Sequence, residues 1–265
     1  MLSIVKADLY RLKYERMIKI VLILAAFFML TYPVPAAEIF AEAGIEYDIE
    51  TLRAYGSTAF FNIGFDGFAN LLIPLLVVVI FSSEFSKRTF MNIVGTKIDR
   101  FNIFCGKMIS FSISVFCLVS FCAFLCTLEF TLLYGWGEYF SIVQVLKLLF
   151  VVCLVSAAEI AYTGLTIILS TIIHSSSLVV VIYFGVTIVE SMFSSVFVAL
   201  SEHTKGSLPF PIFEYISYWF PSSYLYDLSK LEIRLDSTVA MIVPIVFYIA
   251  VTVIIGSSLF KKVEF

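Results

Sequence analysis

Three glutamates lie inside strongly apolar stretches, where a carboxyl group is costly to keep. Glu159 occurs in SAAEIAYTG, Glu190 in VTIVESMF, and Glu129 near the end of a third apolar run. A charge at the centre of a membrane helix costs about 2.5–3.5 kcal/mol, so such residues tend to face a protein interior. Two interpretations stay open. Either the glutamates line a pathway, or each is protonated and hydrogen-bonds a hydroxyl group of a neighbouring helix. Hydroxyl groups near them belong to Ser156, Thr163 and Thr187.

The motifs of familiar membrane enzymes are absent from the sequence. It contains no HExxH pair for zinc, no GxSxG elbow for a nucleophilic serine and no cluster of spaced aspartates. It also lacks the Walker A loop that binds ATP. The five cysteines form no CxxC pair, and we expect them to pack as small apolar residues. We therefore expect a protein that is not an enzyme and holds no metal or cofactor in this chain.

The composition is typical of a membrane protein. Of 265 residues, 61% are hydrophobic and only 14% are charged, whereas a soluble domain is about half apolar and a quarter charged. Backbone groups in lipid must be satisfied within their own segment, so apolar runs of this length are expected to be α-helices. Six runs qualify: 18–37, 67–83, 104–133, 142–173, 177–200 and 238–260. The sequence predicts an all-α polytopic protein, with residues 1–265 forming one transmembrane domain.

The positive charges predict the orientation of these spans. Most lysines and arginines occur in the N-terminal segment, in 82–107 and at the C-terminus. By the positive-inside rule, both termini and 82–107 are cytoplasmic. Loops 38–66, 134–141 and 201–237 then face outward. We expect a multi-pass protein of the inner or plasma membrane.

Residues 1–17 are expected to form an amphipathic helix on the inner leaflet that runs into the first span. Apolar residues recur at helical spacing, and charged residues occupy the positions between them. The apolar set is Leu2, Val5, Leu9 and Leu12, and the charged set is Lys6, Asp8, Arg11, Lys13 and Glu15. The alternative is an ordinary basic flank that only fixes the topology.

Two predicted outer loops differ in character. Loop 38–66 is acidic, and a negative rim would attract cationic ligands, although a simple solvated loop is equally compatible. The rim residues are Glu42, Glu46, Asp48 and Glu50. Loop 201–237 is rich in aromatic residues and contains three prolines. We expect it to form short interfacial helices between the fifth and sixth spans that close the outer end of the bundle.

A polar, basic segment interrupts the chain between the second and third spans. The order Glu84, Arg88-Thr89, Gly95, Arg100 and Lys107 resembles the first cytoplasmic segment of type-2 ATP-binding-cassette (ABC) exporter permeases. In that family a Glu opens the segment, a Gly-Thr pair follows, and an Arg and a Lys lead into the third span. This chain has Arg-Thr at the pair. A plain positive-inside loop is the alternative.

The six-span layout also resembles that family, and most closely the permeases of bacitracin-resistance and lantibiotic-immunity exporters. The resemblance implies that 84–100 is a coupling helix that docks on a separate ATPase subunit, which binds ATP and Mg²⁺. The docking residues would be Glu84, Phe85, Lys87, Arg88, Thr89, Asn92, Gly95 and Arg100. It further implies a second permease chain, identical or a sister chain, and export of an amphipathic or hydrophobic substrate between spans 2 and 5. An antimicrobial peptide is the best candidate.

Two other functions remain open. The chain could be an ion-coupled secondary carrier that uses Glu159 and Glu190, or a non-transporting scaffold or sensor subunit. The sequence shows no inverted repeat and no mid-span helix expected to be broken by Gly or Pro, which counts against the carrier. In each case membrane lipid is an expected partner and nucleic acid is not.

Overall fold

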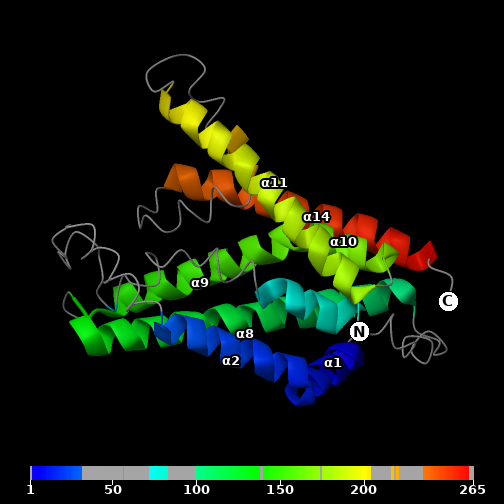
Figure 1. Ribbon diagram of the computed structural model, residues 1–265, viewed down its shortest axis with the longest axis horizontal. Coiled ribbons are helices and arrows are strands. Elements are labelled where there is room, and N and C mark those ends of the chain that lie inside the picture. The colour runs from blue at the N-terminus through cyan, green and yellow to red at the C-terminus, as the bar shows by residue number, and fades with distance from the viewer. Residues whose placement is uncertain are drawn as a thin grey trace.

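The computed structural model describes residues 2–31, 56, 72–82, 99–137, 140–173, 175–203, 216–217, 219–220 and 235–262. Within these ranges every regular element is a helix and none is a strand, so the predicted all-α class is confirmed. Together they form an elongated bundle (Figure 1). The helices are α1 (Leu2–Tyr14), α2 (Arg16–Thr31), the π-helix η1 (Val78–Ser82), α8 (Arg100–Tyr134), α9 (Ile142–Tyr162), α10 (Gly164–Ile172), α11 (Ser176–His203) and α14 (Leu235–Lys262).

Four of the helices are long and apolar enough to cross a membrane. They are Arg100–Tyr134, Ile142–Ile172, Ser177–Leu200 and Met241–Lys261, and they match the last four predicted spans. The first two predicted spans correspond to α2 and to the apolar helix Leu72–Phe81, both of which are shorter. Residues 32–37 and 67–71 lie outside the described residues, so the count of six stays a prediction. With 35 residues, α8 is about 52 Å long and exceeds a hydrocarbon core of about 30 Å.

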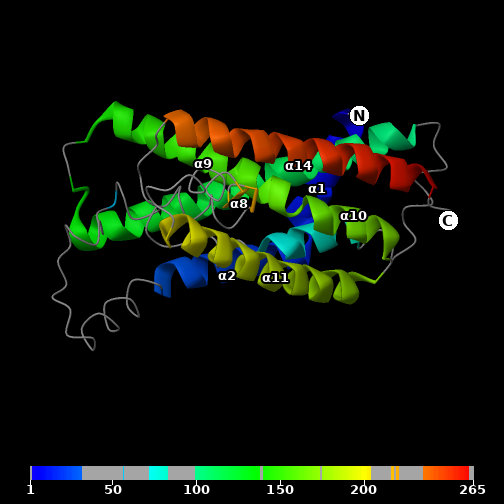
Figure 2. The same cartoon turned by 90° about the horizontal axis from the view of Figure 1, so that it is seen from above.

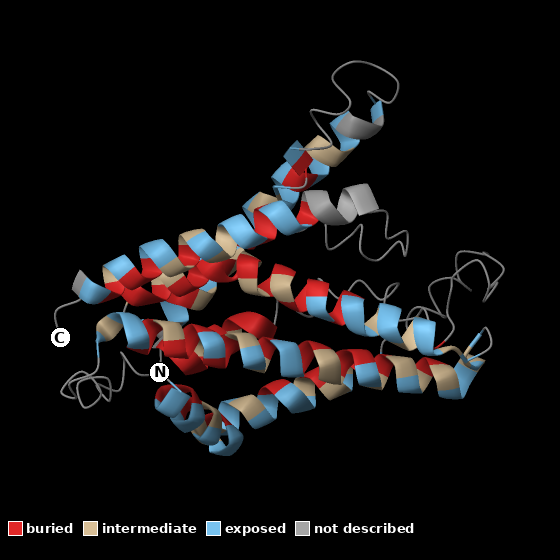
Figure 3. Cartoon of the chain, turned by 180° about the vertical axis from the view of Figure 1, so that it is seen from behind, coloured by how far each residue is buried: buried red, intermediate tan, exposed pale blue. Residues whose placement is uncertain are grey.

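α8 is the centre of the bundle. It packs against α1, α2, α9, α14 and η1, and it is the most buried of the four long helices. Its buried apolar side chains recur every three or four residues, which brings them onto one side of the helix. α11 is the least buried long helix, and it packs mainly against α10 and η1. Figure 3 shows buried residues where the helices face one another and exposed residues along their outer sides.

Two glycines let helices approach closely. At Gly256 of α14, a β-carbon would overlap the ring of Phe104 on α8. At Gly164 of α10, a β-carbon would overlap the side chain of Thr252 on α14. The ring of Phe104 also packs on Phe260, with 5.6 Å between centroids. The absence of a side chain at Gly256 lets α14 approach α8, and its absence at Gly164 lets α10 approach α14.

The predicted fourth span is not one uninterrupted helix. α9 ends at Tyr162 and α10 begins at Gly164. The hydroxyl of Thr163, between them, donates to the carbonyl of Glu159 at 2.8 Å. A threonine bonded to its own backbone and a following glycine both weaken helix continuity. The irregularity at Thr163 is local, because its backbone amide still bonds to the Glu159 carbonyl and its carbonyl accepts from Ile167, each at 3.0 Å. Pro244 lies inside α14, which continues through it as one helix. The prediction that no span is broken at Gly or Pro is therefore not overturned.

The N-terminal helix is confirmed, but its apolar residues are used inside the chain. Val5 and Leu12 are buried, as are Ile4 and Asp8, and this side of α1 packs against α8. Leu2, by contrast, is 81% exposed. The helix ends at Tyr14 and α2 starts at Arg16, so α1 does not run unbroken into the first span. The apolar side of α1, which could have faced lipid, is covered by α8 instead.

Trp219 and Phe220 pack against two helices, α14 and α11. The ring of Phe220 stacks on Phe197 of α11 at 5.4 Å between centroids. Trp219 packs edge-on against Phe247 of α14, and its carbonyl accepts a hydrogen bond from the Tyr248 hydroxyl at 2.9 Å. The described part of loop 201–237 therefore links α11 to α14. The remainder of the predicted outer helices lies outside the described residues.

Gly256→Val should destabilise the chain by about 1–3 kcal/mol, because the new side chain must displace the Phe104 ring from a packed interface. Thermal unfolding of the detergent-solubilised protein, followed by size-exclusion chromatography, measures this. Gly185→Val is the matched control, since a β-carbon at Gly185 meets nothing within 4 Å. Equal losses for the two variants would contradict the proposed close approach.

Candidate functional site

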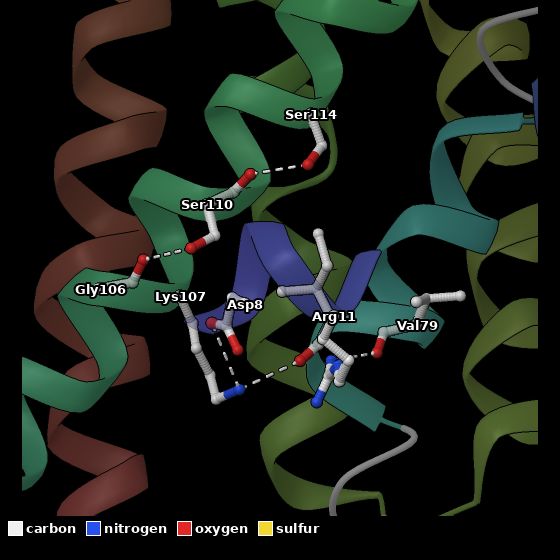
Figure 4. A network of polar contacts seen from close by, with 8 residues as sticks. Asp8, Arg11, Val79, Gly106, Lys107, Ser110 and Ser114 are labelled. Carbon is white, nitrogen blue, oxygen red and sulfur yellow. Dashed lines mark hydrogen bonds and ion pairs between the residues drawn. The ribbon is translucent and has the colours of Figure 1, made fainter. Parts of the chain in front are cut away.

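A buried ionic junction joins α1, η1 and α8. The Nζ atom of Lys107 lies 3.8 Å from Oδ2 of Asp8. It also donates to the carbonyl of Ile80 at 3.3 Å, while Arg11 donates to the carbonyl of Val79 at 3.0 Å. Figure 4 shows Lys107 and Arg11 converging on η1 from two different helices. We call this group, Asp8, Arg11, Lys107 and the two carbonyls, the ionic junction.

The junction brings two cations to the backbone of η1. Lys107 and Arg11 come from different helices and donate to adjacent carbonyls, those of Ile80 and Val79. Hydrogen bonds from charged donors are stronger than those between neutral groups. Ser110 and Ser114 nearby donate to carbonyls of their own helix, at 3.0 Å and 2.8 Å. Their hydroxyl protons are therefore not directed at Asp8.

Burial makes the ion pair a strong positional constraint. Lys107 is 1% exposed and Asp8 is 5% exposed. Removing one partner of a buried pair leaves an uncompensated charge and costs about 3–5 kcal/mol. The junction therefore holds α1 against η1 and α8 in one arrangement. η1 and α8 are the helices that directly precede and follow the 83–98 segment.

A second contact fixes the start of α8. Arg100 donates from Nη1 to the carbonyl of Lys261, near the end of α14, at 2.9 Å. The N-terminal helix, the start of α8 and the end of α14 are thus gathered at one end of the bundle. This brings together the three segments in which the sequence concentrates its lysines and arginines. Of the predicted docking residues, Arg100 already has this partner inside the chain.

The other predicted docking and rim residues lie outside the described residues. This applies to the docking set Glu84, Phe85, Lys87, Arg88, Thr89, Asn92 and Gly95, and to the acidic rim Glu42, Glu46, Asp48 and Glu50. Their roles stay predictions.

A second polar group lies in the apolar part of the bundle, between α9 and α11. The Tyr162 hydroxyl donates to Oε2 of Glu190 at 3.4 Å. The rings of Tyr162 and Tyr183 meet edge to face, with 5.9 Å between centroids. Glu159 is 0% exposed and interacts electrostatically with both tyrosines. We call these four residues the tyrosine–glutamate cluster.

The structure thus brings Glu159 and Glu190 to the same pair of tyrosines. Glu129 lies apart on α8, close to Cys126. The hydroxyl groups of Ser156, Thr163 and Thr187 donate to backbone carbonyls of their own helices. The side-chain hydrogen bond to Glu190 comes from the hydroxyl of a tyrosine, Tyr162, on α9. Whether the glutamates line a pathway or serve as polar contacts stays a prediction.

Sequence analysis overlooked both tyrosines and the Asp8–Lys107 pair. For the cluster a signal was present: Glu159 and Tyr162 are three residues apart, and Tyr183 and Glu190 are seven apart. Both spacings put the two side chains on one face of a helix. For the ionic junction no comparable signal exists, because Asp8 and Lys107 are 99 positions apart in sequence and meet only through packing.

The cluster has the chemistry to hold a proton or a cationic group within an apolar surrounding. Carboxyl and phenol oxygens supply acceptors, and the cluster adjoins the interruption at Thr163. Within the described ranges, no group of three or more His, Cys, Asp or Glu side chains is arranged to hold a metal ion.

Comparison with protein-family models and with curated proteins finds no match to this chain.

Lys107→Met should lower the free energy of unfolding by about 3–5 kcal/mol, because Asp8 would stay buried without its cation. The double variant Asp8→Asn/Lys107→Met should recover much of this loss, since the uncompensated charge is gone. Thermal unfolding in detergent compares the variants. The control Lys147→Met removes an exposed lysine from α9. A Lys107→Met protein as stable as this control would contradict the importance of the pair.

Proposed function

We propose that this chain is the membrane-embedded permease subunit of an ABC exporter. The observation that carries the proposal is the ionic junction at the basic end of the bundle. Asp8, Arg11 and Lys107 hold the flanks of the 83–98 segment, and Arg100 ties the start of α8 to the end of α14. A segment that receives force from another protein needs such rigid attachment to pass that force on.

In this proposal the chain has six spans, with both termini and the basic end in the cytoplasm. Residues 84–100 form the coupling helix and dock on a separate ATPase subunit that binds ATP and Mg²⁺. The ATPase closes on ATP and pushes the coupling helix. Because η1 and α8 flank this helix and are joined through Lys107, the push reaches both spans together rather than bending one of them.

A second permease chain, identical or a sister chain, completes the proposed exporter. The resemblance assigns spans 2 and 5 to the interface between the chains. The described part of span 2 is almost wholly buried inside the chain, whereas α11 exposes many large apolar side chains. Of these two spans, α11 is therefore the one with surface available for a neighbour. It is also the least buried long helix, which suits an element that moves during transport.

The proposed substrate is an amphipathic or hydrophobic molecule, with a cationic antimicrobial peptide as the best candidate. The acidic residues Glu42, Glu46, Asp48 and Glu50 would attract a cationic peptide to the outer end. The tyrosine–glutamate cluster would offer it a polar contact within the membrane. Resistance or immunity to such a peptide would be the biological outcome.

Affinity purification of the chain from native membranes tests the permease proposal. We expect an ABC ATPase to co-purify in near-stoichiometric amount and to be lost in Arg88→Glu/Asn92→Glu, because the reversed charge lies on the docking helix. Quantitative mass spectrometry of the purified complex is the measurement.

Lys147→Glu provides the matched control, since it introduces the same kind of charge reversal at an exposed site on α9. It should retain the ATPase. An intact preparation that contains no ATPase would reject the permease proposal.

A secondary carrier is the second candidate function, and the tyrosine–glutamate cluster favours it. Ionisable side chains within membrane helices are a common feature of ion-coupled carriers, and this cluster contains the buried Glu159 and the half-buried Glu190. The carrier predicts that the chain alone, in proteoliposomes with an imposed proton gradient, accumulates a fluorescent cationic peptide. It also predicts that Glu190→Gln abolishes this uptake. The permease proposal predicts no gradient-driven accumulation without the ATPase, so the two functions are separable.

A further inference from the structure

One side of α1 remains exposed after the helix packs on α8. Its residues are Leu2, Ser3, Lys6, Tyr10, Lys13 and Tyr14, all exposed and spaced so that they share one side of the helix. We call this the lysine–tyrosine face. Tyr10 is 68% exposed and Tyr14 is 58% exposed.

The lysine–tyrosine face carries positive charge only. Asp8 is the one acidic residue of α1, and it is buried on the opposite side against Lys107. The ionic junction therefore removes the negative charge from the surface of this helix. Arg16 and Lys19, exposed at the start of α2, extend the positive surface, with the half-buried Glu15 between the helices.

The aromatic rings sit among the cations. The ring centroids of Tyr10 and Tyr14 are 5.1 Å apart, and Nζ of Lys13 is 5.8 Å from the Tyr14 ring centroid. Tyrosine favours the headgroup region of a bilayer, because its ring is apolar and its hydroxyl polar. Lysine can lay its hydrocarbon stem along such rings and keep its ammonium group at the headgroups. The face thus combines the two residue types that suit a headgroup layer.

The direction of α1 fits the same partner. Figure 2 shows α1 crossing the long axis of the bundle, along which the four apolar helices run. If these helices span a bilayer, α1 lies close to its plane, at the end where the basic segments meet. We infer that the lysine–tyrosine face binds the headgroups of anionic phospholipids, such as phosphatidylglycerol, in the leaflet at this end. Charge complementarity selects an anionic headgroup over a zwitterionic one.

The inference rests on the proposed membrane orientation but not on the ATPase. Its test uses Tyr10→Trp in the full chain, reconstituted in nanodiscs of phosphatidylcholine and phosphatidylglycerol. Two nanodisc preparations contain the two lipids at equal mole fraction, and only one of the lipids is brominated in each. The quenching measured in the chain without Tyr10→Trp, which comes from Trp136 and Trp219, is subtracted from that of the variant. We expect the new tryptophan to be quenched preferentially by brominated phosphatidylglycerol, with a local enrichment of about fivefold for each lysine.

Charge variants show whether the lysines cause the preference. In the Tyr10→Trp chain, the further substitutions Lys6→Gln and Lys13→Gln should make brominated phosphatidylglycerol and brominated phosphatidylcholine quench the new tryptophan about equally. Lys6→Arg/Lys13→Arg and the control Lys147→Gln should both keep the preference. Equal quenching by the two lipids in the unsubstituted background would overturn the inference, because contact would then be indifferent to headgroup charge.

Absence of quenching by either lipid would also overturn it, and would indicate that protein covers this face. Neither failure touches the permease proposal, since no ATPase is present in the nanodiscs. Conversely, a lipid preference in a chain that never co-purifies with an ATPase would support the lipid inference and reject the permease proposal.

Discussion

The buried ion pair between Asp8 and Lys107 is the constraint on which the basic end of this bundle depends. An ion pair with both partners almost fully buried tolerates little displacement, because either partner left alone pays a large desolvation cost. Lys107 simultaneously donates to the carbonyl of Ile80 in η1. One side chain of α8 therefore fixes the relative positions of three elements: the N-terminal helix, the end of η1 and α8 itself.

The two ends of the bundle are built on different principles. The basic end is held by charge-assisted bonds between elements far apart in sequence, including Arg100 with the carbonyl of Lys261. Towards the other end, α11 is held through aromatic packing of Phe197 on Phe220 and through the Tyr162–Glu190 hydrogen bond. A rigid end and a more lightly packed helix suit a protein in which force enters at one place and movement occurs at another. This division supports the permease proposal without depending on the identity of the substrate.

The same ion pair links the interior to the surface. By burying the one acidic residue of α1, it leaves the exposed side of that helix purely cationic. The burial of Asp8 against Lys107 therefore has two consequences: it attaches α1 to the bundle, and it leaves the proposed lipid-binding side of α1 positively charged. The tyrosine–glutamate cluster is independent of this arrangement, since its residues come from α9 and α11. It lies beside Thr163, where α9 ends and α10 begins one residue later.

The sequence by itself determined the helical class and the four long apolar helices, because lipid forces backbone bonds to close within each segment and this needs only local composition. It also identified Glu159 and Glu190 as acids within apolar helices, of which Glu159 is buried and Glu190 half-buried. It could not supply the partners. Asp8 and Lys107, or Tyr162 and Glu190, meet across helices, and helical periodicity says which face a residue occupies but not what that face touches. For α1 the periodicity was right and the apolar side was real, yet only the tertiary structure decided that α8, and not lipid, would cover it. The physical reason is that α8 can match Val5 and Leu12 in shape and also offer Lys107 to Asp8, whereas a fluid apolar phase would leave that carboxylate without a cation.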